Sequence, residues 1–104
     1  MSTQPTYPSD PTPEQWAVIE PILKRALYGR KRKLIGAPRK YSLYDLYRAI
    51  NYVLVHGIRW RNLPNDLPPW QVVYYHFRRW QAVGALEKVE RALRAQSQRR
   101  ARRG

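Results

Sequence analysis

The sequence of 104 residues contains no cysteine and only two histidines, His56 and His76, which lie far apart in the chain. Disulfides and thiolate chemistry are therefore excluded, and we expect no metal site because the usual nitrogen and sulfur ligands are not clustered. The N-terminus has no apolar segment, and no apolar run is long enough to span a bilayer. We therefore expect no signal peptide, no membrane partner and a cytoplasmic location.

Acidic residues are also scarce, with 7 Asp and Glu in total. None stands beside a histidine or serine at a spacing that suggests acid–base or nucleophilic catalysis. Asp45 fits a helix cap, Asp66 a turn and Glu14 the first turn of a helix. No glycine-rich phosphate loop follows a strand pattern. We therefore expect no catalytic site and no cofactor, and so a chain that is not itself an enzyme.

Positive charge is what the sequence has in excess. There are 20 Lys and Arg, the formal net charge is +13 and the pI is about 10.8. Such a charge would repel itself in a compact domain, so it indicates a polyanionic partner, and nucleic acid fits best. The hydrophobic content of 43% is sufficient for one globular domain.

The apolar periodicity predicts an all-α fold, a small bundle of about four helices containing a helix-turn-helix. Residues 1–11 are rich in proline and are expected to be a flexible or loosely docked lead-in to a helical domain at 12–98. The first helix should run from Pro13 to about Leu27, because Thr12 and Gln15 form a capping-box pattern. Pro21 should bend or interrupt it near Glu20.

The second helix should begin after Ser42 and end at Gly57. Its apolar stripe consists of Leu46, Ile50, Val53 and Leu54. Three tyrosines lie off this stripe, where they serve either as half-buried packing or as phosphate-binding hydroxyls: Tyr44, Tyr47 and Tyr52. A proline-rich turn at 58–69 follows, with Trp60 and Leu63 as its expected anchors to the core.

The third helix, at about 70–83, is the predicted recognition helix. Its spacing turns four apolar residues toward the core: Trp70, Val73, Phe77 and Trp80. Its other side carries the candidates for contact with DNA bases: Gln71, Val72, Tyr75, Arg78 and Arg79. Gln can pair with adenine, Arg with guanine, and Val72 can contact a thymine methyl group.

A fourth helix is predicted at 85–98, with an apolar stripe of Leu86, Val89 and Leu93, before a frayed basic tail at 99–104. A basic segment at 24–41 separates the first two helices and contains no acid. We interpret it as an arm along phosphates or in a minor groove, the alternative being a solvated linker. The candidates for phosphate contact in the arm and the turn are Arg30, Lys31, Arg32, Lys33, Arg39, Lys40, Arg59 and Arg61.

Several short motifs occur in order between about residues 7 and 93. The most specific are Trp60-Arg61 with Leu63-Pro64, and the block from Pro68-Pro69-Trp70 to Phe77-Arg78-Arg79-Trp80. The others are Tyr7-Pro8-Ser9-Asp10, Glu14-Gln15-Trp16 with Ile19-Glu20-Pro21, Pro38-Arg39-Lys40-Tyr41 and Val73-Tyr74. Together they resemble the N-terminal domain of bacterial insertion-sequence transposases of family five, the four-hundred-and-two-like group.

This resemblance implies a domain that binds the terminal repeats of an insertion element. It also implies that the protein is bacterial and associated with the nucleoid. In that family a separate ribonuclease-H-like domain, with an acidic DDE triad that binds divalent metal, cuts and joins DNA. The chain ends where that domain would begin, so we expect DNA binding without catalysis. Gly36-Ala37-Pro38 replaces the usual Gly-Arg-Pro of the arm, which weakens a minor-groove contact at that point.

Two alternatives stay open at this level. The chain could be one half of a transposase encoded in two reading frames, with catalysis supplied by a separate chain. It could also be a basic RNA-binding protein. The expected partner is double-stranded DNA, and the expected protein partners are a second copy of the chain or a transposase catalytic subunit.

Overall fold

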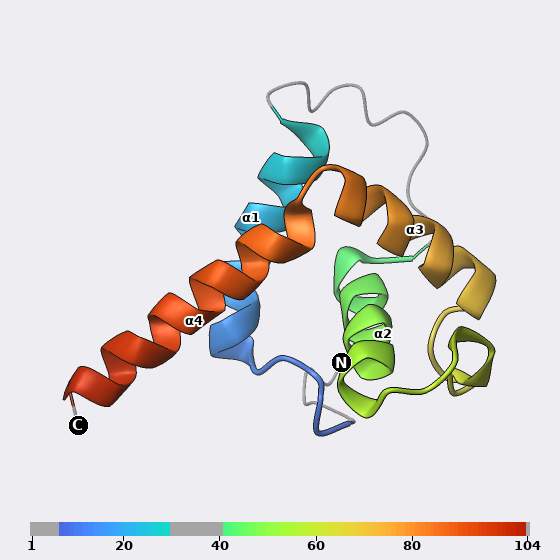
Figure 1. Ribbon diagram of the computed structural model, residues 1–104, viewed down its shortest axis with the longest axis horizontal. Coiled ribbons are helices and arrows are strands. Elements are labelled where there is room, and N and C mark those ends of the chain that lie inside the picture. Colours follow the sequence, from blue (N-terminus) through green and yellow to red (C-terminus); the bar gives the residue numbers. More distant parts are fainter. Residues whose placement is uncertain (1–6, 30–40, 104) are drawn as a thin grey trace.

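A computed structural model describes residues 7–29 and 41–103, with side chains described as far as Arg99 (Figure 1). Its regular elements are α1 (Pro13–Tyr28), α2 (Leu43–His56), the short 3-10 helix η2 (Trp60–Asn62), α3 (Trp70–Ala82) and α4 (Ala85–Arg103). The described ranges contain no strand, and the predicted all-α bundle is confirmed. α1 packs most extensively against α4, while α3 contacts both α2 and α4.

Local signals start α1 where the sequence predicts. The hydroxyl of Thr12 accepts a hydrogen bond from the backbone N–H of Gln15 at 3.1 Å, and the Gln15 amide oxygen accepts one from the Thr12 N–H at 3.0 Å. The predicted interruption near Pro21 is wrong, because α1 continues unbroken through it. Pro21 and Ala17, whose carbonyl loses its helical donor, are both exposed, so water can satisfy that carbonyl.

Both predicted ends of α2 are confirmed. The Ser42 hydroxyl accepts a hydrogen bond from the Asp45 N–H at 3.0 Å. Gly57 has φ 65° and ψ 31°, the left-handed conformation, and its N–H donates to the carbonyl of Val53. Glycine suits this position because it has no Cβ to clash in that conformation.

The predicted apolar stripe of α2 is wrong at one position. Leu54 is 55% exposed, whereas Tyr47, which the pattern placed off the stripe, is buried at 7%. Tyr47 packs beside Trp16 of α1, with ring centroids 6.0 Å apart. Compared with the predicted stripe, the buried face of α2 includes Tyr47 and excludes Leu54. The reason is that α2 packs against α1 as well as against α3.

The chain between α2 and α3 is held by buried apolar residues. Leu63 is 9% and Leu67 5% exposed, and Trp60 packs partly buried against the core. The two predicted anchors of this turn, Trp60 and Leu63, are thus confirmed. α3 then starts at Trp70, and Gly84, with φ 73°, turns the chain from α3 into α4.

α4 is longer than predicted and continues through the expected basic tail to Arg103. Ala, Arg and Gln, which dominate this segment, all have high helix propensity, so the arginines do not stop the helix. In Figure 1 the C-terminal turns of α4 extend beyond the rest of the bundle.

The core lies where the four helices meet. Its fully buried side chains come from all of them: Ile19, Leu23, Leu46, Ile50, Val73, Trp80 and Val89. Burial of an aliphatic side chain contributes about 1.5–3 kcal/mol. In α3 the buried residues are Val73 and Trp80, and they hold the helix by its inner face.

Candidate nucleic-acid interface

α3 has one face in the core and the other in solvent. Val73 and Trp80 are 0% and 1% exposed, and Trp70 and Phe77 pack partly buried against the core, as predicted. The exposed candidates for base contact are Gln71, Tyr75, Arg78 and Arg79, and Val72 is half-buried beside them. At about 100° per residue, the exposed four fall within one arc of about 100° on the outer side of the helix.

Tyrosines orient the two arginines of this outer face. Arg78 Nη1 donates to the hydroxyl of Tyr74, and Arg79 Nη1 donates to the hydroxyl of Tyr75, both at 3.1 Å. Each guanidinium also lies over the ring of the same tyrosine, at 5.9 Å and 5.7 Å from the centroids. Residues four apart are neighbours on a helix, so the sequence itself sets these pairs. One contact per guanidinium leaves its other donors facing solvent.

η2 brings one of the predicted phosphate-contact residues, Arg61, beside α3. Trp60 packs its ring against Phe77 of α3, with centroids 4.9 Å apart. Arg59 and Arg61, which flank it, are exposed. The Arg61 guanidinium lies 6.0 Å from the ring centroid of Trp70, the first residue of α3. The aromatic anchor therefore places a cation next to the start of the helix.

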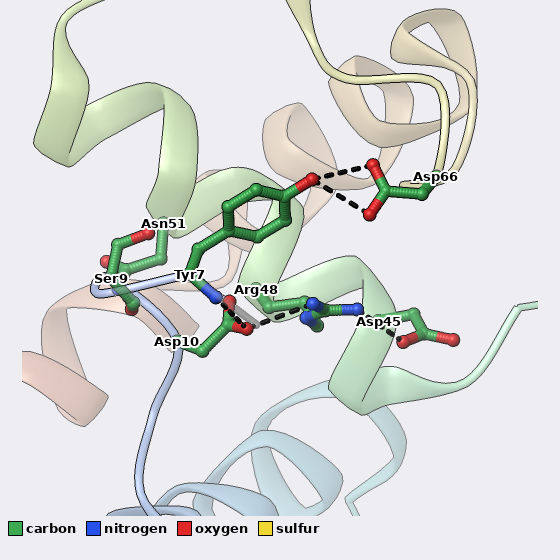
Figure 2. A network of polar contacts seen from close by, with 7 residues as sticks. All are labelled: Tyr7, Ser9, Asp10, Asp45, Arg48, Asn51 and Asp66. Carbon is green, nitrogen blue, oxygen red and sulfur yellow. Dashed lines mark hydrogen bonds and ion pairs between the residues drawn. The ribbon is translucent and has the colours of Figure 1, made fainter. Parts of the chain in front are cut away.

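Polar contacts tie residues 7–10 to α2 and to the loop before α3 (Figure 2). The Tyr7 hydroxyl donates to the carboxylate of Asp66, 2.6 and 2.8 Å from its two oxygens. Asp10 forms a buried ion pair with Arg48 at 2.9 Å. Asn51 Nδ2 donates to the carbonyl of Ser9 at 2.6 Å. These contacts clamp residues 7–10 across α2 and hold the loop that leads into α3.

Sequence reasoning missed this clamp and treated the lead-in as flexible or loosely docked. The signal that could have found it is the Tyr7-Pro8-Ser9-Asp10 motif, which the resemblance had already marked. A tyrosine and an aspartate at a fixed spacing indicate specific contacts, which a loosely docked segment does not make.

The clamp also shifts the ionisation of its members. The hydrogen bond to Asp66, and then burial, raise the pKa of Tyr7 to about 12. Burial lowers the pKa of Arg48, but its hydrogen bond to Asp10 and the charge of that carboxylate outweigh this and leave the pKa raised. Both shifts favour the neutral phenol and the charged guanidinium found in the clamp.

A scan against protein families matched residues 12–90 to the family described as "Putative transposase of IS4/5 family". The chain belongs to the IS4/5 transposase family. This confirms the resemblance to the N-terminal domain of an insertion-sequence transposase. Comparisons with curated proteins and with solved structures gave no match.

The match to the IS4/5 family extends from the Thr12 cap of α1 to Glu90, in the second turn of α4. The matched range includes the outer face of α3, η2 and the loop that contains Asp66. Six of the predicted phosphate-contact residues lie outside the described residues: Arg30, Lys31, Arg32, Lys33, Arg39 and Lys40. The structure therefore brings Arg61 of the turn together with the candidates of α3, places Arg59 exposed in the turn, and leaves the arm as a prediction.

The acids of this IS4/5-family chain are dispersed over the described structure. Within residues 7–29 and 41–99, no group of three or more His, Cys, Asp or Glu side chains is placed to hold a metal ion. Most of the acids bond to nearby side chains: Glu20 with Lys24 and Asp45 with Arg48, and Glu87 and Glu90 with arginines of α4. In the same part of the chain, no helix has the length and apolar character that crossing a membrane requires.

Proposed function

We propose that this chain is the DNA-binding module of an IS4/5-family transposase and recognises duplex DNA at the terminal repeats of the element. In this proposal α2 and α3 form a helix-turn-helix, and the outer face of α3 enters the major groove. Arg59, Arg61 and the basic arm contact phosphates on either side. Strand cleavage is assigned to a catalytic domain or subunit beyond the 12–90 match.

The proposal depends on one observation, that one face of α3 is buried in the core and the opposite face is exposed. Val73 and Trp80 fix its inner face in the core, while the outer face presents Gln71, Arg78 and Arg79 to solvent. A major groove about 12 Å wide admits a helix, and a rigidly held helix places its side chains at a fixed register against the base edges.

The chemistry of the outer face suits the reading of bases. A guanidinium can donate two hydrogen bonds to guanine, and the Gln71 amide can pair with adenine through a donor and an acceptor. The Tyr74 and Tyr75 contacts restrict the arginine rotamers before binding, which lowers the conformational entropy lost in the complex. The net charge of +13 supplies the attraction to phosphates that is independent of sequence.

The test begins with selection of bound sites from random duplexes at moderate salt. Gln71→Ala and Arg78→Ala should each reduce the preference for the selected site over a scrambled duplex by about 1–3 kcal/mol. Arg99→Ala is the matched control, because it removes an exposed cation from α4 and not from α3. It should weaken binding to both duplexes equally, as the loss of a phosphate contact does.

Three results would refute the proposal. The first is a selection that enriches no motif. The second is an equal loss on both duplexes after Gln71→Ala and Arg78→Ala, which would leave only attraction to charge. The third is displacement of the selected duplex by structured RNA at lower concentration than by the same unlabelled duplex, which would favour the RNA-binding alternative.

A further inference from the structure

A groove of about 640 Å³ lies between α2 and α4 and is closed at one end by α3. α2 and α4 make little direct contact, so apolar side chains that face this groove stay exposed. Leu54 and Val55 on α2 are 55% and 61% exposed, and Leu86 and Leu93 line the opposite wall on α4. Large apolar side chains clustered on a surface in this way mark a site of interaction with another molecule.

The charge at the groove is opposite to that of the whole chain. Its only charged lining residues in the described structure are Glu87 and Glu90 of α4, in a chain of net charge +13. Glu90 and Tyr47 of α2 both line the groove, and burial, and then the Glu90 carboxylate, raise the pKa of Tyr47. A surface that is apolar and rimmed by acids fits an apolar partner that carries cations.

α4 itself carries the matching cations. Arg91 and Arg94 follow the two acids by one helical turn, and they form exposed ion pairs within the helix, Arg91 with Glu87 at 3.9 Å and Arg94 with Glu90 at 3.2 Å. Lys88 lies about 160° round the helix from Glu90 and so faces away from the groove. On the exposed face of α4 that borders the groove at Glu87 and Glu90, the two acids are therefore followed along the helix by the two arginines, which do not line the groove themselves.

This order of charges is self-complementary when two such helices run antiparallel. Position 87 of one copy then meets position 94 of the other, and position 90 meets position 91. We infer that the groove is a homodimer interface, in which the α4 helices of two copies pack antiparallel and cover Leu54 and Val55. A two-fold interface uses the same patch on both subunits, as this charge order requires. Exposed pairs within one helix contribute little, so exchanging them for pairs between copies costs little.

Charge exchange tests the arrangement directly. One variant carries Glu87→Arg with Glu90→Arg, and the other carries Arg91→Glu with Arg94→Glu. Each variant alone should repel its own copy and raise the dimer dissociation constant by at least about tenfold. An equimolar mixture should form a heterodimer, because the antiparallel pairing then joins unlike charges. Sedimentation with one variant labelled measures this, and circular dichroism checks that each variant is folded.

A second pair of variants tests the apolar part. Leu54→Ser with Val55→Ser should raise the dimer dissociation constant by about 10- to 100-fold, because both side chains lose their apolar burial. Val83→Ser is the matched control, since Val83 is 46% exposed but does not line the groove. It should leave dimerisation unchanged.

Three results would overturn the inference. The wild-type chain could stay monomeric up to about 100 µM, or the mixture of the two charge variants could stay monomeric. Val83→Ser could also weaken dimerisation as much as Leu54→Ser with Val55→Ser does. The assay contains no nucleic acid, so it is independent of the proposed DNA binding.

Discussion

Replacing Asp10 with alanine removes one half of the ion pair that clamps residues 7–10 to α2. The Asp10 side chain is 0% exposed and that of Arg48 is 12% exposed, with 2.9 Å between the carboxylate and the guanidinium. The Asp10 carboxylate also accepts a hydrogen bond from the N–H of Tyr7 at 3.1 Å. The substitution therefore leaves a nearly buried guanidinium without its closest partner.

The expected loss follows from that burial. Removing one member of a buried pair costs about 3–5 kcal/mol, because the charge left behind is not solvated. Arg48 keeps a second contact, with Asp45 at 3.5 Å, so the lower end of this range applies, about 3 kcal/mol. A domain of this size has about 5–15 kcal/mol of stability. Its melting temperature should fall by about 12–24 °C.

Urea and thermal unfolding followed by circular dichroism measure this loss. Glu20→Ala is the control, because it breaks the exposed Glu20–Lys24 pair and should cost less than about 0.5 kcal/mol. The double variant Asp10→Ala with Arg48→Ala should lose less than the sum of its two single variants. If Asp10→Ala costs no more than Glu20→Ala, the reasoning about the buried pair is refuted.

Two further predictions concern the clamp and the end of α2. Tyr7→Phe should lower the free energy of unfolding by about 1 kcal/mol at neutral pH. The raised pKa favours the neutral phenol, so this contribution is complete below pH 10 and disappears as the pH rises toward about 12; an unchanged difference between the two proteins at pH 12 would contradict it. Gly57→Ala should lower the free energy of unfolding, measured in urea, by about 1 kcal/mol. The loss should come only from backbone strain at a φ of 65°, because an added Cβ meets no atom within 4 Å. Gly57→Asn should cost less, because asparagine tolerates this conformation, and an equal loss would argue against backbone strain.

The helices could be predicted because their signals are local. The capping box of Thr12 with Gln15 and the Ser42 cap each involve residues three positions apart, and Gly57 ends α2 by its own backbone conformation. The exposed side chains of α3 followed in the same way from helical periodicity and the partners four residues away.

The clamp could not be predicted in this way, because its partners are distant in sequence. Tyr7 and Asp66 are 59 residues apart, and Asp10 and Arg48 are 38 apart. Only the packing of the helices brings these groups together, so no local pattern gives their pairing. The same holds for Leu54 and Tyr47, whose exposure depends on which helices cover α2 and not on the period of α2 itself.

The sequence by itself thus determined the fold class, the ends of α1 and α2, the two faces of α3 and the excess of positive charge. Each of these depends on neighbours within one or two helical turns, or on composition. The tertiary structure alone decided that Asp10 is buried against Arg48, that Tyr7 reaches Asp66, and that a groove with acidic lining stays open between α2 and α4. These features arise from the relative placement of whole helices, which the periodicity of any one helix does not specify.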